Sequence, residues 1–179
     1  EHPIGSPRLE EIVNPGERVA LIIPDLTRTW ESIDVYTPLI VKALNDAGIR
    51  DEDITIISAT GTHRCQTEAE HRKLVGDDIY DRIGVVDHIC TDKDMHTYFG
   101  TTSHGTPVWL DSRAAAADRV ILTGAVVHHF LAGFGGGRKM ILPGIAARET
   151  IMKNHSLALN PGMGTGSNPN VRSGNITAS

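Results

Sequence analysis

The chain has 179 residues, with 17 lysines and arginines against 22 aspartates and glutamates, and a formal net charge of −5. This length suits one domain with a sizeable core, and the mildly acidic balance without a basic stripe excludes a general nucleic-acid binder. Two cysteines without a CxxC motif exclude a disulfide framework. We expect no signal peptide, and no apolar run approaches the roughly 18 residues of a membrane span. The low cysteine content suits a reducing compartment, so we expect a cytoplasmic protein without nucleic-acid or membrane partners.

The first part of the chain alternates between strand and helix patterns. Residues 18–23 are a compact apolar run that predicts a buried strand. Apolar residues recur at three- and four-residue spacing over 34–47, which predicts an amphipathic helix. Asp34 is a plausible N-cap of this helix, and Gly48 is its expected stop.

The same alternation continues to residue 155. A capping-box pattern at Thr67 predicts a helix over 67–74. We expect further strands at 54–59, 85–89 and 118–123, a β-hairpin at 97–110, and helices at 114–117 and 146–155. Strands that alternate with helices predict an α/β fold, with a Rossmann-like, mostly parallel sheet and helices on both faces. Residues 1–160 would form this domain, and the Gly- and Asn-rich residues 161–179 would form a linker or tail.

Polar motifs follow three of the predicted strands directly. Asp25-Leu-Thr-Arg28 comes after the first strand, 60–64 after the second, and 124–139 after the strand at 118–123. In an open α/β sheet, ligands bind outside the carboxyl ends of the strands, so these motifs are expected to share one pocket. The alternatives are local: Asp25 and Arg28 could cap a turn and pair with each other, and 60–64 could be a tight turn only.

A glycine-rich loop is the most specific signal in the sequence. Gly133 and 135–137 are followed at once by Arg138 and Lys139. Glycines allow positive φ and close approach to a ligand, and exposed N–H groups beside a cation form an anion site. The loop is not a Walker A motif, because Met140 follows the lysine where Ser or Thr is needed. A plain surface loop is disfavoured by the apolar run that follows.

Nine histidines are many for this length. His128 and His129 are neighbours in an extended segment and point in opposite directions, so at most one faces the site. His155 ends a predicted helix and could be a packed or capping residue rather than a ligand. His63 belongs to the motif at 60–64, and the remaining five are expected to be solvated or satisfied surface side chains: His2, His71, His88, His96 and His104.

Taken together, the motifs resemble a known family. They read Asp-x-Thr-Arg, Ala-Thr-Gly-x-His-Arg, His-x-x-x-Gly-x-x-Gly-Gly-x-Lys-x-Ile-x-Pro-Gly and Asn-His. This set resembles the N-terminal domain of the nickel-pincer lactate racemase family from about Pro3 to Ser173. Thr29 stands where that family usually has a proline, on the substrate side of the pocket.

The resemblance implies a cofactor and its ligands. Lys139 matches the lysine that is attached covalently to a nickel-pincer nucleotide, which is pyridinium-3,5-bisthiocarboxylic acid mononucleotide with nickel. His155 matches the histidine that completes nickel coordination beside the sulfur and carbon donors of the cofactor. Gly135, Gly136 and Gly137 match the loop under its phosphate. A recombinant domain made without the maturation enzymes would be expected to lack the cofactor.

The resemblance also implies an isomerase. His63 and His129 match a pair of catalytic histidines, and Asp25 and Arg28 match residues near the substrate. The implied activity is racemisation or epimerisation of a small 2-hydroxy acid by proton-coupled hydride transfer, with the C-terminal domain and the cofactor maturation enzymes as partners. A nucleotide- or anion-binding module without catalysis is the alternative; it explains the glycine loop and Lys139 but not the histidines.

Overall fold

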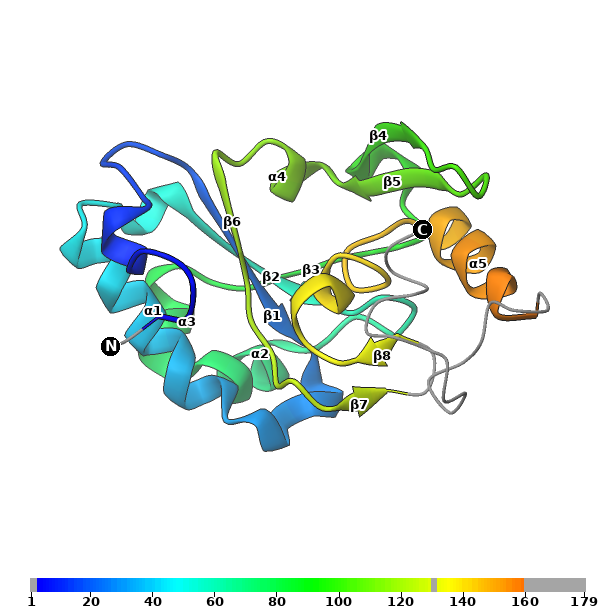
Figure 1. Ribbon diagram of the computed structural model, residues 1–179. Coiled ribbons are helices and arrows are strands. Elements are labelled where there is room, and N and C mark those ends of the chain that lie inside the picture. The colour runs from blue at the N-terminus through cyan, green and yellow to red at the C-terminus, as the bar shows by residue number, and fades with distance from the viewer. Residues whose placement is uncertain (1–2, 130–131, 160–179) are drawn as a thin grey trace.

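The computed structural model describes residues 3–129 and 132–159, and a four-stranded sheet lies at its centre (Figure 1). The strand order is β3-β2-β1-β6, and all three pairings are parallel. Val19 at the start of β1 is level with Ile54 of β2 on one side and with Arg119 of β6 on the other. The strands are β1 (Val19–Pro24), β2 (Ile54–Ala59), β3 (Val86–Asp87) and β6 (Arg119–Leu122).

Three helices cover one face of this sheet: α1 (Ile33–Asp46), α2 (Glu68–Val75) and α3 (Asp77–Arg82). Alternate residues of a strand point to opposite faces, so Leu21 and Ile23 of β1 pack toward the helices. Val41 and Leu44 of α1 meet them in the same buried cluster. This cluster is the larger core of the domain.

The opposite face has a smaller core. Ala20 and Ile22 of β1 pack there against Met140 and Ile145 from the segment that follows the glycine loop. Two short elements, α4 (Ser112–Ala115) and η5 (Gly137–Met140), cover this side. The expected α/β fold with covered faces is therefore confirmed, and β1 is buried along its whole length because both of its faces are covered.

The remaining elements lie outside the sheet. The hairpin of β4 (His96–Thr101) and β5 (Pro107–Asp111) confirms the predicted one, and it lies beside α5 (Arg148–Ser156) at the top right of Figure 1. The backbone N–H of Trp109 donates to Thr150 Oγ1 at 3.0 Å and joins hairpin and helix. Two-residue strands β7 (His128–His129) and β8 (Gly133–Phe134) pair before the glycine loop. Short 3-10 turns complete the chain at Leu9–Glu11 (η1), Leu26–Glu31 (η2), Asp51–Asp53 (η3), Lys93–Met95 (η4) and Leu157–Leu159 (η6).

Two helix starts show where the sequence pattern was right and where it was wrong. Thr67 caps α2 as predicted, since its side chain accepts from Glu70 N and the Glu70 side chain accepts from Thr67 N. Asp34 does not cap α1; that helix begins at Ile33, after Ser32 in a left-handed conformation with φ 57°, and Asp34 lies in its first turn. None of the helices in 3–129 and 132–159 is long and apolar enough to cross a membrane.

Candidate active site

The loops that follow β1, β2 and β6 meet at one edge of the sheet. β2 and β6 lie on opposite sides of β1, so this edge is the point where the strand order reverses, the usual ligand position of such sheets. The backbone N–H of Gly61 donates to Gly144 O at 2.9 Å and joins the loop after β2 to the end of the glycine loop. A pocket of about 90 Å³ lies here, lined by Pro24, Asp25, Thr27, Arg28, Ala59, Thr60, Gly61, Thr62, His63, Lys139, Met140, Pro143 and Gly144.

Asp25 and His63 form the best-defined contact of this pocket. His63 Nδ1 lies 2.5 Å from Asp25 Oδ2, while Asp25 Oδ1 accepts from Thr27 N at 3.2 Å and from its hydroxyl at 2.5 Å. The Asp25 side chain is 7% exposed and that of His63 is 57% exposed. The Asp25 carboxylate can only accept, so Nδ1 of His63 is the donor in this contact, and Nε2 takes no part in it.

Arg28 is held in the pocket by an acid that the sequence did not single out. Its Nη1 lies 3.6 Å from Glu31 Oε1, and the Glu31 side chain is only 2% exposed. Glu31 Oε2 also accepts from Ala125 N at 2.7 Å, which joins the loops after β1 and β6. The Asp25–Arg28 pair left open by the sequence does not form, since Asp25 binds Thr27 and His63 instead.

Lys139 projects from η5 into the pocket and is half-buried. Burial lowers the pKa of its amine, and the nearby Arg28 guanidinium lowers it further, against the opposite influence of the Asp25 and Glu31 carboxylates. A neutral amine is a nucleophile, whereas an ammonium is not. The position therefore favours the reactive form of this lysine.

His129 and His155 lie near Lys139 but do not line the small pocket. Burial lowers the pKa of each imidazole, and the charge of Lys139 is the next cause in both cases. His128 is exposed and its ring meets Phe134 edge-on at 6.2 Å. His129 is the more buried of the two neighbours, and neither of them lines the small pocket. That at most one of them faces the site stays a prediction.

The glycines of the loop differ in what they contribute. A Cβ on Gly135 would lie 3.2 Å from Ala125 O, and one on Gly136 would lie 2.8 Å from Gly124 O. Gly136 and Gly137 also have positive φ, 66° and 47°, but a Cβ on Gly137 would meet open space. Packing against the loop after β6 thus accounts for the first two glycines, and Gly137 alone has room for a ligand beside it.

The described residues could hold a metal ion only if a bound group supplied most of its ligands. No group of three His, Cys, Asp or Glu side chains converges within 3–129 and 132–159. Nδ1 of His155 is buried without a hydrogen-bond partner among these residues, and its lowered pKa favours the neutral imidazole that metals bind. This arrangement suits a group that brings its own metal ligands and needs one histidine and one reactive amine from the protein.

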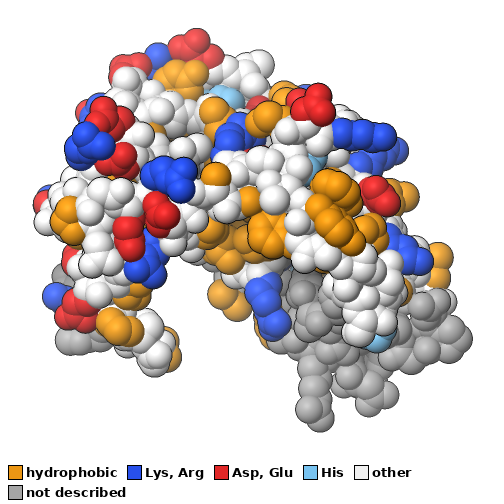
Figure 2. Space-filling view, turned by 90° about the horizontal axis from the view of Figure 1, so that it is seen from above, with side chains coloured by type: hydrophobic (Ala, Val, Ile, Leu, Met, Phe, Trp, Pro, Cys, Tyr) orange, Lys and Arg blue, Asp and Glu red, His pale blue; other side chains and the backbone are white. Residues whose placement is uncertain are grey.

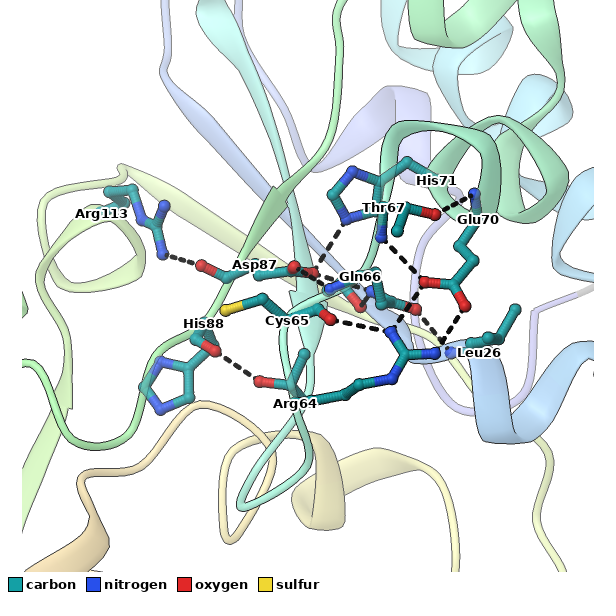
Figure 3. A network of polar contacts seen from close by, with 12 residues as sticks. Leu26, Arg64, Cys65, Gln66, Thr67, Glu70, His71, Asp87, His88 and Arg113 are labelled. Carbon is teal, nitrogen blue, oxygen red and sulfur yellow. Dashed lines mark hydrogen bonds and ion pairs between the residues drawn. The ribbon is translucent and has the colours of Figure 1, made fainter.

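A polar network lies behind the pocket and supports its loops (Figure 3). Gln66 Oε1 accepts from Leu26 N at 2.7 Å, next to Asp25, and Gln66 Nε2 donates to Asp87 Oδ1 at 2.8 Å. Asp87 also contacts His71 Nε2 at 2.9 Å, and its backbone oxygen accepts from Arg113 at 2.9 Å. The start of the loop after β1 is therefore held by Gln66, which is itself held by Asp87 of β3, and Asp87 contacts His71 of α2.

His88 continues this support on the side of the glycine loop. Its Nδ1 lies 3.0 Å from Asp111 Oδ2 and its Nε2 lies 2.9 Å from Ala146 O. The Asp111 carboxylate and the Ala146 carbonyl oxygen are both acceptors, so His88 has an acceptor at each of its two ring nitrogens. Burial raises the pKa of Asp111, but the hydrogen bonds from Arg113 and His88 outweigh burial and lower it.

Three of the histidines expected on the surface are buried. His71 and His88 are held by Asp87 and Asp111, and His96 packs edge-on against His88 at 5.1 Å. The surface expectation was wrong for these three. For His71 and His88, acidic partners distant in sequence offset the cost of burial. Both ring nitrogens of His96 are instead buried without a hydrogen-bond partner among the described residues. His104 is exposed as expected, and His2 lies outside the described residues.

The fold and the pocket define a class of protein: an α/β domain in which a basic, glycine-rich loop and a carboxylate–histidine pair meet at the strand-order reversal. A family model described as the lactate racemase N-terminal domain matches residues 1–166, so the chain belongs to the lactate racemase family.

Named relatives agree with this assignment. The chain is 38% identical over 156 residues to the lactate racemase of Lactiplantibacillus plantarum and 32% identical over 155 residues to that of Thermoanaerobacterium thermosaccharolyticum. Each match covers 87% of this chain but 36% of the relative, so the chain spans about a third of their length. The structure of the lactate racemase apoprotein from the second organism is similar, with a TM-score of 0.80 and 32% identity over 92% of this chain and 39% of that one.

Proposed function

We propose that this chain is the cofactor-carrying domain of a cytoplasmic 2-hydroxy-acid racemase or epimerase whose active site is completed by a second domain after residues 161–179. The observation that carries the proposal is the convergence of Lys139 with Asp25, Arg28 and His63 on one pocket. A half-buried amine of lowered pKa is suited to a covalent bond, and the remaining residues suit a small hydroxy acid beside it.

His63 and His129 are the proposed bases. Racemisation at a carbon that bears a hydroxyl needs a proton removed from that hydroxyl while the hydrogen on carbon departs, and each enantiomer presents its hydroxyl differently. His63 comes from the loop after β2 and His129 from the segment after β6. Two neutral imidazoles from different strands can therefore serve one enantiomer each, accepting the hydroxyl proton and returning it to the planar keto acid.

Arg28 is the proposed substrate anchor. A guanidinium binds a carboxylate through two parallel hydrogen bonds, and Glu31 holds Arg28 in place at 3.6 Å. The Asp25 carboxylate contacts Nδ1 of His63 and so favours the tautomer of His63 with Nε2 unprotonated. These residues would orient the hydroxyl of the substrate toward the bases.

Lys139 and His155 are the proposed attachment points of a nickel-pincer nucleotide, with Gly137 beside its phosphate. When bound, this cofactor supplies the reversible acceptor for the hydride that leaves the substrate carbon. Lys139 would hold it covalently, and His155 would give nickel a neutral imidazole, which suits that metal. Loading would require the maturation enzymes of the host.

The test uses the full-length protein purified from a host that makes the cofactor. Lys139→Ala is expected to lose both the covalent mass adduct and racemisation, whereas Lys73→Ala, an exposed lysine on α2, keeps both. His63→Ala and His129→Ala are each expected to abolish turnover but to retain the adduct and the nickel, with His104→Ala as the matched control. Full activity of Lys139→Ala would overturn the proposal, and loss of nickel from either histidine variant would make that residue a ligand instead of a base.

A further inference from the structure

Glu31 is a buried acid to which the proposed reaction gives no direct part. Its side chain is 2% exposed, whereas on the face seen in Figure 2 the side chains of Asp and Glu lie at the surface beside those of Lys and Arg. Exposed pairs of charges contribute little to a fold. A buried carboxylate is costly unless polar or charged partners surround it, so the contacts of Glu31 show what it is used for.

The two carboxylate oxygens of Glu31 contact two different loops. Oε1 lies 3.6 Å from Arg28 Nη1, and the Arg28 side chain forms no other ion pair or hydrogen bond with a described residue. Oε2 accepts from the backbone N–H of Ala125 at 2.7 Å, in the loop after β6. It also lies against Gly124, where a Cβ would be 3.5 Å from the same oxygen. One carboxylate thus relates the position of the proposed substrate anchor to that of the loop after β6.

The loop after β6 packs directly on the glycine loop. A Cβ on Gly136 would lie 3.0 Å from Ala125 O, and the backbone N–H of Lys139 donates to Gly136 O at 3.0 Å. The same loop continues into β7, which carries His129. Backbone contacts therefore connect the partner of Glu31 with the segment of Lys139, and the chain itself connects it with His129.

Glu31 projects from a well-fixed part of the chain. It ends η2, and the next residue, Ser32, has φ 57° and leads into α1. The backbone oxygen of Ser32 accepts from Val35 N at 3.1 Å, and Ile33 is buried in the larger core. A residue that positions others must be held by its own surroundings, and Glu31 meets this condition.

The charge of Glu31 also acts on the amine of the pocket. Burial lowers the pKa of Lys139 most and Arg28 lowers it further, whereas the carboxylates of Asp25 and Glu31 raise it. A substitution that removes the charge of Glu31 but keeps its shape should therefore lower the pKa of Lys139. This effect does not depend on any catalytic role.

We propose that Glu31 is a positioning residue that sets the place of Arg28 relative to the loops that carry Lys139 and His129. Its effect on turnover rests on the proposed function: a substrate carboxylate held by Arg28 keeps its hydroxyl within reach of the bases only if Arg28 itself is fixed. Glu31 does not line the pocket, so it acts through Arg28 and Ala125 and not on the substrate.

Kinetics of lactate racemisation by the cofactor-loaded full-length protein test the action through Arg28. Glu31→Gln keeps an acceptor for Ala125 but removes the charge opposite Arg28, so KM should rise about tenfold and kcat should fall by a smaller factor. In an Arg28→Gln background, the same change should have no further effect on kcat/KM. Glu17→Gln is the matched control, since Glu17 also contacts an arginine and a backbone N–H but lies at the other end of β1.

Two measurements on the unloaded full-length protein do not depend on racemisation. Glu31→Ala removes the acceptor of the Ala125 N–H, so hydrogen exchange within 124–129 should become about tenfold faster or more, whereas Glu31→Gln should leave it unchanged. Acetylation of Lys139 by acetic anhydride, followed by mass spectrometry as a function of pH, should shift to lower pH in Glu31→Gln. Glu17→Gln should change neither measurement.

Several outcomes would overturn the role of Glu31. A KM that falls in Glu31→Gln would mean that Glu31 only competes with the substrate for Arg28. Equal effects of this change with and without Arg28 would mean that it acts on the fold in general. A protein that does not racemise lactate would count against the proposed function, and unchanged exchange and acetylation would then count against the position of Glu31. If Glu31→Ala fails to fold, Glu31→Gln still decides through KM and acetylation.

Discussion

His63 Nδ1 and Asp25 Oδ2 are 2.5 Å apart, and this contact joins the loops that end two neighbouring parallel strands. A buried carboxylate thus fixes the orientation of a largely exposed imidazole. The same carboxylate accepts two bonds from Thr27, so its own position is fixed as well.

Asp25→Asn is expected to reduce racemisation in the direction that uses His63 as the base. The amide can bind Nδ1 in the opposite tautomer and leaves Nε2 protonated, so the rate should fall about 100-fold or more, a typical contribution of general base catalysis. Measuring kcat separately for the two enantiomers checks this. Asp46→Asn on the exposed side of α1 is the control, and equal rates for Asp25→Asn and the unchanged protein would contradict the role.

The charges around His129 give a pH-dependent prediction. Burial lowers the pKa of His129 most, and the positive charges of Lys139 and Arg28 lower it further because they disfavour the imidazolium. In the unloaded chain, Arg28→Gln should therefore raise the pKa of His129, and Lys139→Met should raise it too. Histidine NMR titration measures the shifts.

His155 is the internal control of that titration. Its pKa is lowered by burial and by Lys139, and Arg28 is not among the causes. Lys139→Met should therefore raise the pKa of His155, whereas Arg28→Gln should leave it in place. Equal responses of both histidines to Arg28→Gln would contradict the arrangement of charges described above.

Gly136→Ala is expected to destabilise the domain more than Gly137→Ala. Gly136 has φ 66° and ψ −171°, a conformation almost confined to glycine, and a Cβ there would lie 2.8 Å from Gly124 O. Gly137 has φ 47° but open space around it. We expect a difference of about 2 kcal/mol in the free energy of unfolding, measured by urea denaturation. Equal losses would mean that the backbone contact with Gly124 is unimportant.

Asp111→Asn should reveal the ion pair that the buried Asp111 forms with Arg113, together with its contact with His88. Removing one partner of such a pair costs about 3–5 kcal/mol at neutral pH. The pKa of Asp111 is lowered from its usual 3.8, so this stabilisation is present above pH 3.8 and is lost as the pH falls below it. Urea denaturation between pH 7 and pH 3 should show the difference between the two proteins narrowing in acid. A difference that is constant over this range would contradict the ionised state of Asp111.

Periodicity and chain order predicted the framework well. The buried runs of β1 and β2, the capping box at Thr67 and the hairpin are local signals, and the structure confirms each of them. The helix α3 was missed because it buries only Ile79, which leaves no apolar repeat to read. The start of α1 was misread because Ser32 adopts a left-handed conformation that no local pattern announces.

Chain order predicted that some of the site residues lie together, but it did not predict the contacts that support them. Order along the chain placed Asp25, His63 and Lys139 on one sheet edge, and the pocket joins them. Glu31 contacts the backbone N–H of Ala125, which lies 94 residues further along the chain. His88 contacts the backbone oxygen of Ala146, which lies 58 residues further along. Such contacts depend on tertiary packing, and a single sequence gives no sign of them. The roles assigned to the site residues stay predictions.

The larger hydrophobic cluster is separate from the glycine loop. All its buried members lie between Val13 and Val85, and none comes from the glycine loop. Met140 and Ile145 attach the far end of that loop to the opposite face of the sheet. The main core therefore does not depend on contacts of the glycine loop, so the proposed loading of Lys139 would change a segment that lies outside that core.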